Sequence, residues 1–232
     1  IGLSPKLQTI LAGQSGDYAL PPSEIALLSH TAIVWDYSEG AYYPKHHFKH
    51  FVDTIVAAIT EGGGVVVYST PVERIEVKDR QVQSVTAGGK QYRATKAYIS
   101  DLDPKLTVQL MHDSHALSDR EVRRLTSYEY SASAFNIYLG LDRTFDPHKY
   151  GIGNWNIWYY PTGDLNRAYQ QQLAGNLHHP WIFLSCPTMK SDEPGMAPAG
   201  NHVLEIATIC PYEPFKQLHD NDPKAYKAKK RE

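Results

Sequence analysis

An apolar stripe of helical spacing, followed at once by three glycines, is the feature that most constrains the fold of this chain. Its members recur at steps of three and one: Phe48, Phe51, Val52, Ile55, Val56 and Ile59. Such spacing aligns them on one side of an α-helix. Gly62–Gly64 ends that helix, and the apolar run at 65–68 predicts a buried strand. Helix, glycine turn and buried strand form the second half of a βαβ crossover, so we expect part of a parallel-sheet layer.

Short strands and turns follow this crossover. They predict a three-stranded meander, with turns at 79–80 and at the glycines 88–89. After Pro104 the pattern becomes helical, and Ser118 with Glu121 has the spacing of a capping box. The predicted strands are 73–78, 81–87, 90–94 and 96–100, and the predicted helices up to this point are 4–12, 22–35, 48–59, 104–112 and 118–127.

The rest of the chain has the pattern of an antiparallel sheet. Apolar and other residues alternate through 131–141, which is the period of a strand with one buried face. Further strands are predicted at 154–160, 181–186 and 202–209, and helices at 163–174, 212–219 and 223–232. The predicted fold is therefore mixed α+β and α/β. Residues 43–103 form part of a nucleotide-binding layer, and residues 1–42 with 104–232 form a domain on the antiparallel sheet, with flanking helices.

Composition excludes several classes of function. The 232 residues include 23 Lys and Arg against 25 Asp and Glu, and the basic residues are scattered. A nucleic-acid partner needs clustered positive charge, and the one basic run, at 224–231, is typical of a solvated helix face. Cys186 and Cys210 lie outside any CxxC spacing, which fits a reducing compartment and a cytoplasmic location. No apolar stretch reaches the ~20 residues of a membrane span.

Histidines at the start of the first strong helix are the main candidates for a metal site. His46 and His50 are four residues apart, a spacing that zinc sites use, and His47 lies between them. The HExxH pattern is absent, and none of the three belongs to the apolar stripe. Solvent-facing or cofactor-facing histidines are the favoured interpretation, with no metal expected. The sequence positions no catalytic acid, base or nucleophile.

Several segments of the chain together match the pattern of one known family. They include Gly40–Pro44, Glu61–Gly64, Thr70–Ile75, Ile99–Pro104 and Tyr138–Leu141. Residues 186–188 and 197–202 match as well, so the match covers roughly 1–215 of the chain. In these segments the chain resembles the phytoene desaturases, carotenoid isomerases and retinol saturases, within the wider FAD-dependent amine-oxidase-like group.

The resemblance implies where a flavin would be held. It places the backbone of Val72, after Pro71, against the FAD adenine, and Ser100 with Asp101 near the cofactor. The family commonly has a glycine pair close to the flavin where this chain has His46 and His47. That departure puts normal flavin contact in doubt at these two positions, which remain candidate cofactor neighbours.

The resemblance also implies an apolar substrate tunnel roofed by the antiparallel sheet. Its wall candidates are Tyr138, Trp155, Trp158 and Tyr160, for which plain sheet packing stays an open alternative. Sixteen tyrosines suit such a wall, because each offers a broad ring with a polar tip. The helices at 4–12 and 22–35 could contact a membrane peripherally or could cap the sheet.

The function implied is that of the substrate-binding portion of an FAD-dependent oxidoreductase. The reaction would be a desaturation, saturation or isomerisation of a polyene, isoprenoid or related apolar small molecule. The GxGxxG turn of a dinucleotide site is absent, and the chain starts at Ile1. We therefore expect an internal piece of a longer enzyme, inactive and without retained FAD when isolated. A non-catalytic module that binds an apolar ligand or a partner is the alternative.

Overall fold

The computed structural model describes residues 2–111, 116–130 and 132–231. The chain divides into two compact units, Ile1–Ile55 with Ser131–Glu232 and Val56–Tyr130. The predicted division separates an FAD-binding part, 43–103, from a substrate-binding part, 1–42 with 104–232. This division by binding role stays a prediction. The predicted ends of three elements, at residues 112, 131 and 232, lie outside the described residues.

The first unit is built on a four-stranded antiparallel sheet of order β4-β7-β6-β5. Its strands are β4 (Ser133–Leu141), β5 (Ile157–Tyr159), β6 (Ile182–Ser185) and β7 (His202–Cys210). The long strands β4 and β7 pair along their whole length, from Ser133 opposite Cys210 to Leu141 opposite His202. The predicted antiparallel sheet is confirmed, with β5 shorter than the aromatic run that predicted it.

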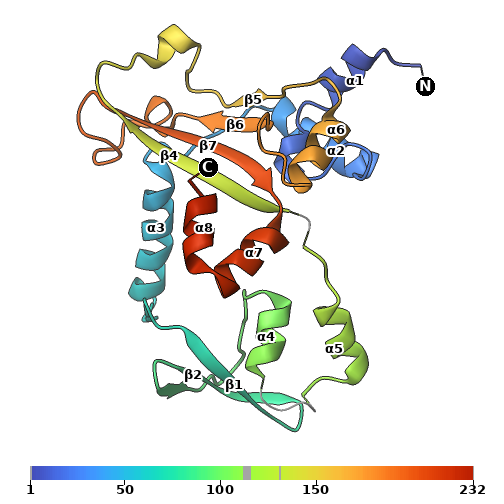
Figure 1. Cartoon of the computed structure of the whole chain (residues 1–232). Helices are drawn as coiled ribbons and strands as arrows, with labels where there is room; N and C mark the ends of the chain where they lie inside the picture. Colours follow the sequence, from blue (N-terminus) through green and yellow to red (C-terminus); the bar gives the residue numbers. More distant parts are fainter. Residues whose placement is uncertain (1, 112–115, 131, 232) are drawn as a thin grey trace. The chain divides into compact units, whose positions relative to one another are not determined.

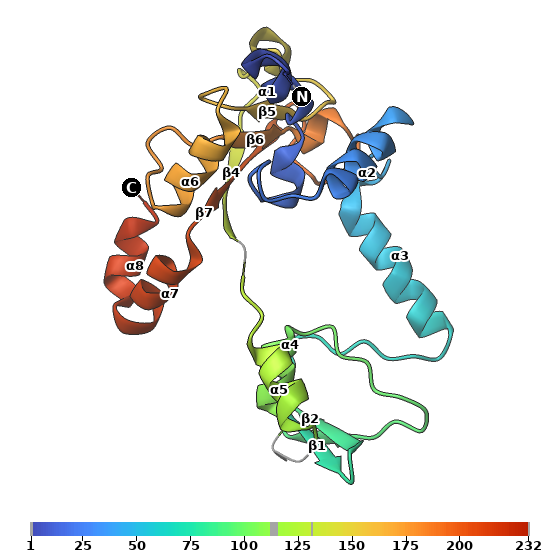
Figure 2. The ribbon, with the colours of Figure 1, turned by 90° about the vertical axis from the view of Figure 1, so that its right-hand side faces the viewer.

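Helices flank this sheet. They are α1 (Pro5–Leu11), α2 (Leu27–Ser38), α6 (Leu165–Leu173), α7 (Tyr212–Asn221) and α8 (Pro223–Lys229), with 3-10 turns η1 (Ser15–Tyr18), η2 (Pro147–Tyr150) and η3 (Pro187–Met189). Ser4 caps α1 as its type predicts. β7 leads directly into α7 and α8, which form a helical hairpin beside it (Figures 1 and 2).

Both faces of the sheet contribute to the core of this unit. On one face, Leu204 packs with Ile152 and Cys186. At the other, Trp181 and Ile209 pack with residues of α6, and Trp158 lies against them. These two clusters separate because successive side chains of a strand point to opposite faces.

The N-terminal segment folds back onto the second cluster. Tyr160 and Tyr169 donate hydrogen bonds from their hydroxyls to the carbonyls of Gly13, at 2.8 Å, and Ala19, at 2.6 Å. Gly16 lies so close to Trp158 that an added Cβ would be 2.2 Å from the indole ring. Only glycine therefore permits this approach of backbone to ring.

The second unit holds the predicted meander, in the order β1-β2-β3. Its strands are β1 (Val72–Lys78), β2 (Gln81–Ala87) and β3 (Lys90–Tyr92), and its helices are α4 (Pro104–Leu110) and α5 (Asp119–Thr126). Asp79 and Arg80 have φ values of 52° and 61°, the left-handed pair of a tight two-residue hairpin. The capping box of Ser118 and Glu121 is present as predicted.

The parallel layer expected from the glycine-rich crossover is not seen in the described residues. Helix α3 (His47–Glu61) forms as predicted and runs from one unit into the other. The run at 65–68 is irregular, with Val65 81% exposed, and so is 96–100, with Ile99 95% exposed. An apolar run becomes a strand only beside a pairing partner, and no partner for either run lies in the described part of the chain.

None of the helices in the described ranges is both long enough and apolar enough to cross a membrane.

Candidate functional site

A row of polar side chains crosses one face of the four-stranded sheet. The register sets Tyr138 of β4 opposite Glu205 of β7, and Glu205 opposite Ser185 of β6. Residues directly opposite each other share a face, so these three side chains line up across the strands. Asn156, just before β5, continues the row, as its contact with Lys190 shows. In the next row on that face, two aromatic residues are neighbours, because Trp158 lies opposite Phe183.

Lys190 joins this row from the segment after η3. Its ammonium donates hydrogen bonds to Ser185 Oγ, at 2.8 Å, and to Asn156 Oδ1. Burial lowers the pKa of Lys190, while Cys186 and Glu205 oppose that shift. The row therefore holds a partly desolvated cation that donates to the end of β6 and to the residue before β5.

Tyr43 covers the cation from the segment that precedes α3. The Lys190 ammonium lies 5.4 Å from the centre of the Tyr43 ring, within the range of a cation–π contact. Burial raises the pKa of the Tyr43 hydroxyl, and the negative charge of Glu205 adds to this shift. We define Tyr43, Tyr138, Asn156, Ser185, Lys190 and Glu205 as the polar row.

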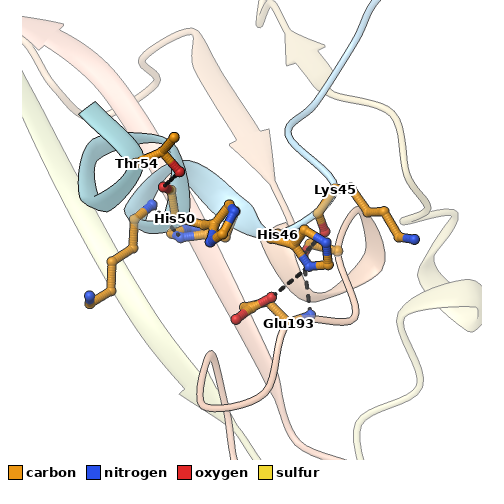
Figure 3. A network of polar contacts seen from close by, with 8 residues as sticks. Lys45, His46, His50, Thr54 and Glu193 are labelled. Carbon is orange, nitrogen blue, oxygen red and sulfur yellow. Dashed lines mark hydrogen bonds and ion pairs between the residues drawn. The ribbon is translucent and has the colours of Figure 1, made fainter. Parts of the chain in front are cut away.

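His46 is held next to this row by a carboxylate. Its Nδ1 lies 2.9 Å from Glu193 Oε2, and its ring is 5.1 Å from that of His50 (Figure 3). The same loop is tied down where the Ser191 hydroxyl donates to the carbonyl of Lys45, at 2.6 Å. Within the described residues no group of three or more His, Cys, Asp or Glu side chains is arranged to hold a metal ion.

His47 adopts a backbone conformation that favours glycine. Its φ is 64°, and its N–H donates to the carbonyl of Pro44 at 3.0 Å. A side chain in this left-handed region costs about 1–2 kcal/mol. The turn therefore holds His47, a residue with a side chain, in a conformation that glycine adopts more easily.

The remaining cofactor candidates lie in the second unit. Val72 begins β1, an outer strand that pairs with β2 on one side, and Pro71 precedes it. Ser100 and Asp101 are exposed and lie just before α4, where the Ser100 hydroxyl is 2.9 Å from that of Thr107. Of the six cofactor candidates, two therefore lie in the first unit and four in the second.

The residues present meet the needs of FAD at one end only. The exposed start of an outer strand at Val72 leaves backbone groups accessible to an adenine ring. At His46 and His47, two side chains fill space that a glycine pair would leave open. The close approach of a flavin ring is therefore not supported at these positions.

The four predicted wall residues have different surroundings. Tyr138 belongs to the polar row and is 65% exposed, and Trp155 is exposed over Gly153. Trp158 packs against Trp181, with ring centres 5.6 Å apart, and Tyr160 also lies against this core cluster. Contact with a substrate stays a prediction for all four.

Sequence reasoning missed most of the polar row. Glu205 carried a usable signal, because it is the one carboxylate within the largely apolar strand His202–Cys210. Lys190 lies in a Pro- and Gly-rich loop, and nothing in its local pattern distinguishes it from a solvated lysine.

No family model matches this chain. Curated relatives include an all-trans-retinol 13,14-reductase of Danio rerio, 25% identical over 228 residues, which covers 94% of this chain and 37% of the relative. A phytoene dehydrogenase of Streptomyces griseus is 24% identical over 208 residues, covering 89% of this chain and 38% of the relative. This chain thus spans less than half the length of these relatives.

A solved structure shows the same fold. The crystal structure of an oxidoreductase from Methanosarcina mazei matches with a TM-score of 0.67 at 18% identity, over 95% of this chain and 48% of that one. The resemblance predicted from the sequence is confirmed: over most of its length, this chain is a distant homologue of all-trans-retinol 13,14-reductase and phytoene dehydrogenase.

Proposed function

We propose that this chain is the substrate-binding portion of an FAD-dependent oxidoreductase acting on polyene, isoprenoid or related apolar substrates. The observation that carries the proposal is homology to two such named proteins across most of the chain. In this proposal residues 43–103 supply part of the FAD-binding layer, and residues 1–42 with 104–232 supply the substrate domain.

FAD, when bound, supplies hydride exchange, which no side chain can. Val72 would hold the adenine through its backbone, with Pro71 fixing the approach of the chain, and Ser100 with Asp101 would lie near the cofactor. His46 and His47 are the weak point, since their side chains occupy the place of the glycine pair.

The sheet supplies binding and orientation of the substrate. An apolar chain would lie along the aromatic side chains on the face that carries Tyr138, which is exposed. An oxygen-bearing end of the substrate would meet the polar row, where Lys190 offers a cation and Glu205 an acceptor. Aromatic walls with a few polar groups are typical of small-molecule sites, because the walls exclude water and the polar groups set orientation.

An absorbance spectrum tests the proposal. We expect the complete gene product, purified beside this 232-residue chain, to carry a flavin band near ~450 nm. The isolated chain is expected to lack that band. A complete gene product without flavin, even after reconstitution with FAD, contradicts the oxidoreductase proposal.

A non-catalytic binding module is the second candidate. The two imidazoles at positions 46 and 47 favour this candidate. His47 has a φ of 64°, but its side chain fills the space that a glycine would leave open. In this case neither the complete gene product nor the 232-residue chain would bind flavin, but both would bind an apolar ligand. Tryptophan fluorescence quenching by a polyene distinguishes the two, because it does not need a bound cofactor.

We further propose a cytoplasmic protein that contacts a membrane peripherally. Both cysteines are free and buried, which suits a reducing compartment. Exposed apolar residues of α2, namely Leu27, Leu28 and Trp35, provide the contact. Flotation with lipid vesicles checks this, and Leu27→Ser with Leu28→Ser should abolish flotation without changing thermal stability.

A further inference from the structure

A pocket lies on the face of the sheet opposite to the polar row. It has a volume of about 550 Å³, within the size range of ligand pockets. Ile137 of β4 lies opposite Ile206 of β7, and both line the pocket. Tyr138, the next residue along β4, points to the opposite face. The pocket is therefore distinct from the candidate functional site.

The floor and walls of this pocket are apolar. Strands contribute Phe135, Ile137, Ile182 and Ile206, and the helical hairpin contributes Phe215 of α7. The hairpin is fixed internally, because the ring of His219 in α7 packs edge-on against Tyr226 in α8, with centres 5.2 Å apart. Asp222 caps the start of α8 by accepting from the N–H groups of Lys224 and Ala225.

The rim of the pocket is cationic. Lys229, Lys230 and Arg231, at and just after the end of α8, line it together with His178. Among the described residues that line the pocket, none carries a carboxylate. Cations at a helix C-terminus are common, because they complement the helix dipole. Their position at the mouth of an apolar pocket is a separate observation, and it points to an anion.

We propose that this pocket binds an anionic amphiphile: an apolar chain of lipid or isoprenoid type that ends in a carboxylate or a phosphate. The chain would lie on Ile137, Ile206 and Phe215, where burial of apolar surface drives binding. The anionic head would pair with Lys230 and Arg231, since guanidinium groups match the geometry of both carboxylate and phosphate. The site needs no flavin, so it stands or falls separately from the proposed oxidoreductase function.

Two matched double variants test the charge requirement. Lys230→Gln with Arg231→Gln removes two cations that line the pocket, and Lys224→Gln with Lys227→Gln removes two cations of α8 that do not. All four side chains are exposed, so neither variant should disturb the core. The probe is an 18-carbon conjugated tetraenoic acid, whose fluorescence rises on binding, compared with its methyl ester below the micellar concentration.

We expect the acid to bind the unmodified chain about tenfold more tightly than the ester, a difference of ~1.4 kcal/mol. Lys230→Gln with Arg231→Gln should abolish this preference, and the control pair should retain most of it. Ile137→Gln should weaken acid and ester alike. Dodecyl phosphate competing more strongly than dodecanoate, which has the same chain length, identifies a phosphorylated lipid as the source, and the reverse identifies a fatty or polyene acid.

Three results would overturn the site. The first is equal affinity for acid and ester. The second is an equal loss of the preference for the acid in the two double variants. The third is an affinity for both probes that Ile137→Gln leaves unchanged. Circular dichroism of each variant separates these outcomes from misfolding. Flavin content of the complete gene product is a separate readout that none of these substitutions should change.

Discussion

The side-chain oxygen of Gln172 accepts a hydrogen bond of 3.0 Å from the backbone N–H of Trp181. The nitrogen of the same amide donates to Thr208 Oγ1, at 2.7 Å, and to the carbonyl of Ile209, at 3.1 Å. One side chain of α6, only 1% exposed, thus joins the chain entering β6 to the end of β7. A buried amide with all these partners specifies how helix and sheet pack.

Replacing Gln172 should therefore destabilise the first unit. Gln172→Leu has a similar volume but leaves the Trp181 N–H and the Ile209 carbonyl without their partner, at a cost of about 2–4 kcal/mol in unfolding free energy. Chemical unfolding followed by tryptophan fluorescence measures the loss. Gln171→Leu, at the exposed neighbouring position, is the control and should change stability by less than about 0.5 kcal/mol. Equal effects of the two would contradict the role of the amide.

Glu205 should set the pKa of two groups of the polar row. Its negative charge raises the pKa of Tyr43 and also raises that of Lys190, whose pKa burial lowers more strongly. Glu205→Gln should therefore lower the pKa of both groups at once. NMR titration of the lysine ammonium and absorbance titration of tyrosine detect the shifts, and Glu213→Gln on α7 should leave both unchanged. A shift in only one group would mean that Glu205 does not lie between them.

Tyr130 should influence acid stability in the second unit. Its hydroxyl donates to Asp103 Oδ2 at 2.8 Å, and this bond is the largest cause of the lowered pKa of Asp103. A lowered carboxyl pKa stabilises the fold above the unfolded value near 3.8, and this stabilisation is lost as pH falls through the folded value. Tyr130→Phe should raise the Asp103 pKa and reduce stability at neutral pH, while the difference between variant and parent disappears in acid.

Carboxyl NMR titration of Asp103 measures this directly. Tyr128→Phe, two residues earlier and exposed, serves as the control. An unchanged Asp103 pKa in Tyr130→Phe would show that the backbone hydrogen bonds of Leu106 and Lys105 at the start of α4 suffice.

Placing glycine at positions 46 and 47 should strengthen the binding of flavin. His46→Gly with His47→Gly removes both imidazoles and relieves the left-handed strain at His47, whose φ is 64°. We expect the complete gene product with this double change to retain more flavin, measured as the ratio of absorbance near ~450 nm to protein absorbance. His50→Ala, one helical turn later, is the control. Lower flavin content in the double variant would instead make the two imidazoles cofactor ligands.

Elements that are specified by local sequence patterns were predicted correctly, and elements that depend on distant partners were not. Helix α3 and strand β4 were predictable because a periodicity is local and repeats several times. Ser118 and Glu121 were predictable because a capping box is a contact within one turn. The run at 65–68 was wrong as a strand, since whether an apolar run pairs depends on a partner that its own residues do not specify.

Most of the polar row could not be predicted from the sequence, for a related reason. It assembles from β4, β6, β7 and three segments outside these strands, and only the strand register brings Tyr138, Glu205 and Ser185 into line. A one-residue change of register would place them on opposite faces. Tyr138 could be proposed through resemblance to a family, whereas Lys190 required the folded chain.

The close fit of Gly16 against Trp158 has a consequence for the order of folding. The partners of the first 20 residues, Trp158, Tyr160 and Tyr169, lie about 140–150 positions later in the chain. Contacts between such distant residues form late, because a long loop must close first. On the ribosome, these residues emerge before their partners and must wait until Trp158, Tyr160 and Tyr169 have emerged. Residues 1–20 are therefore made well before the core on which they pack, and chaperones would meet them in the interval.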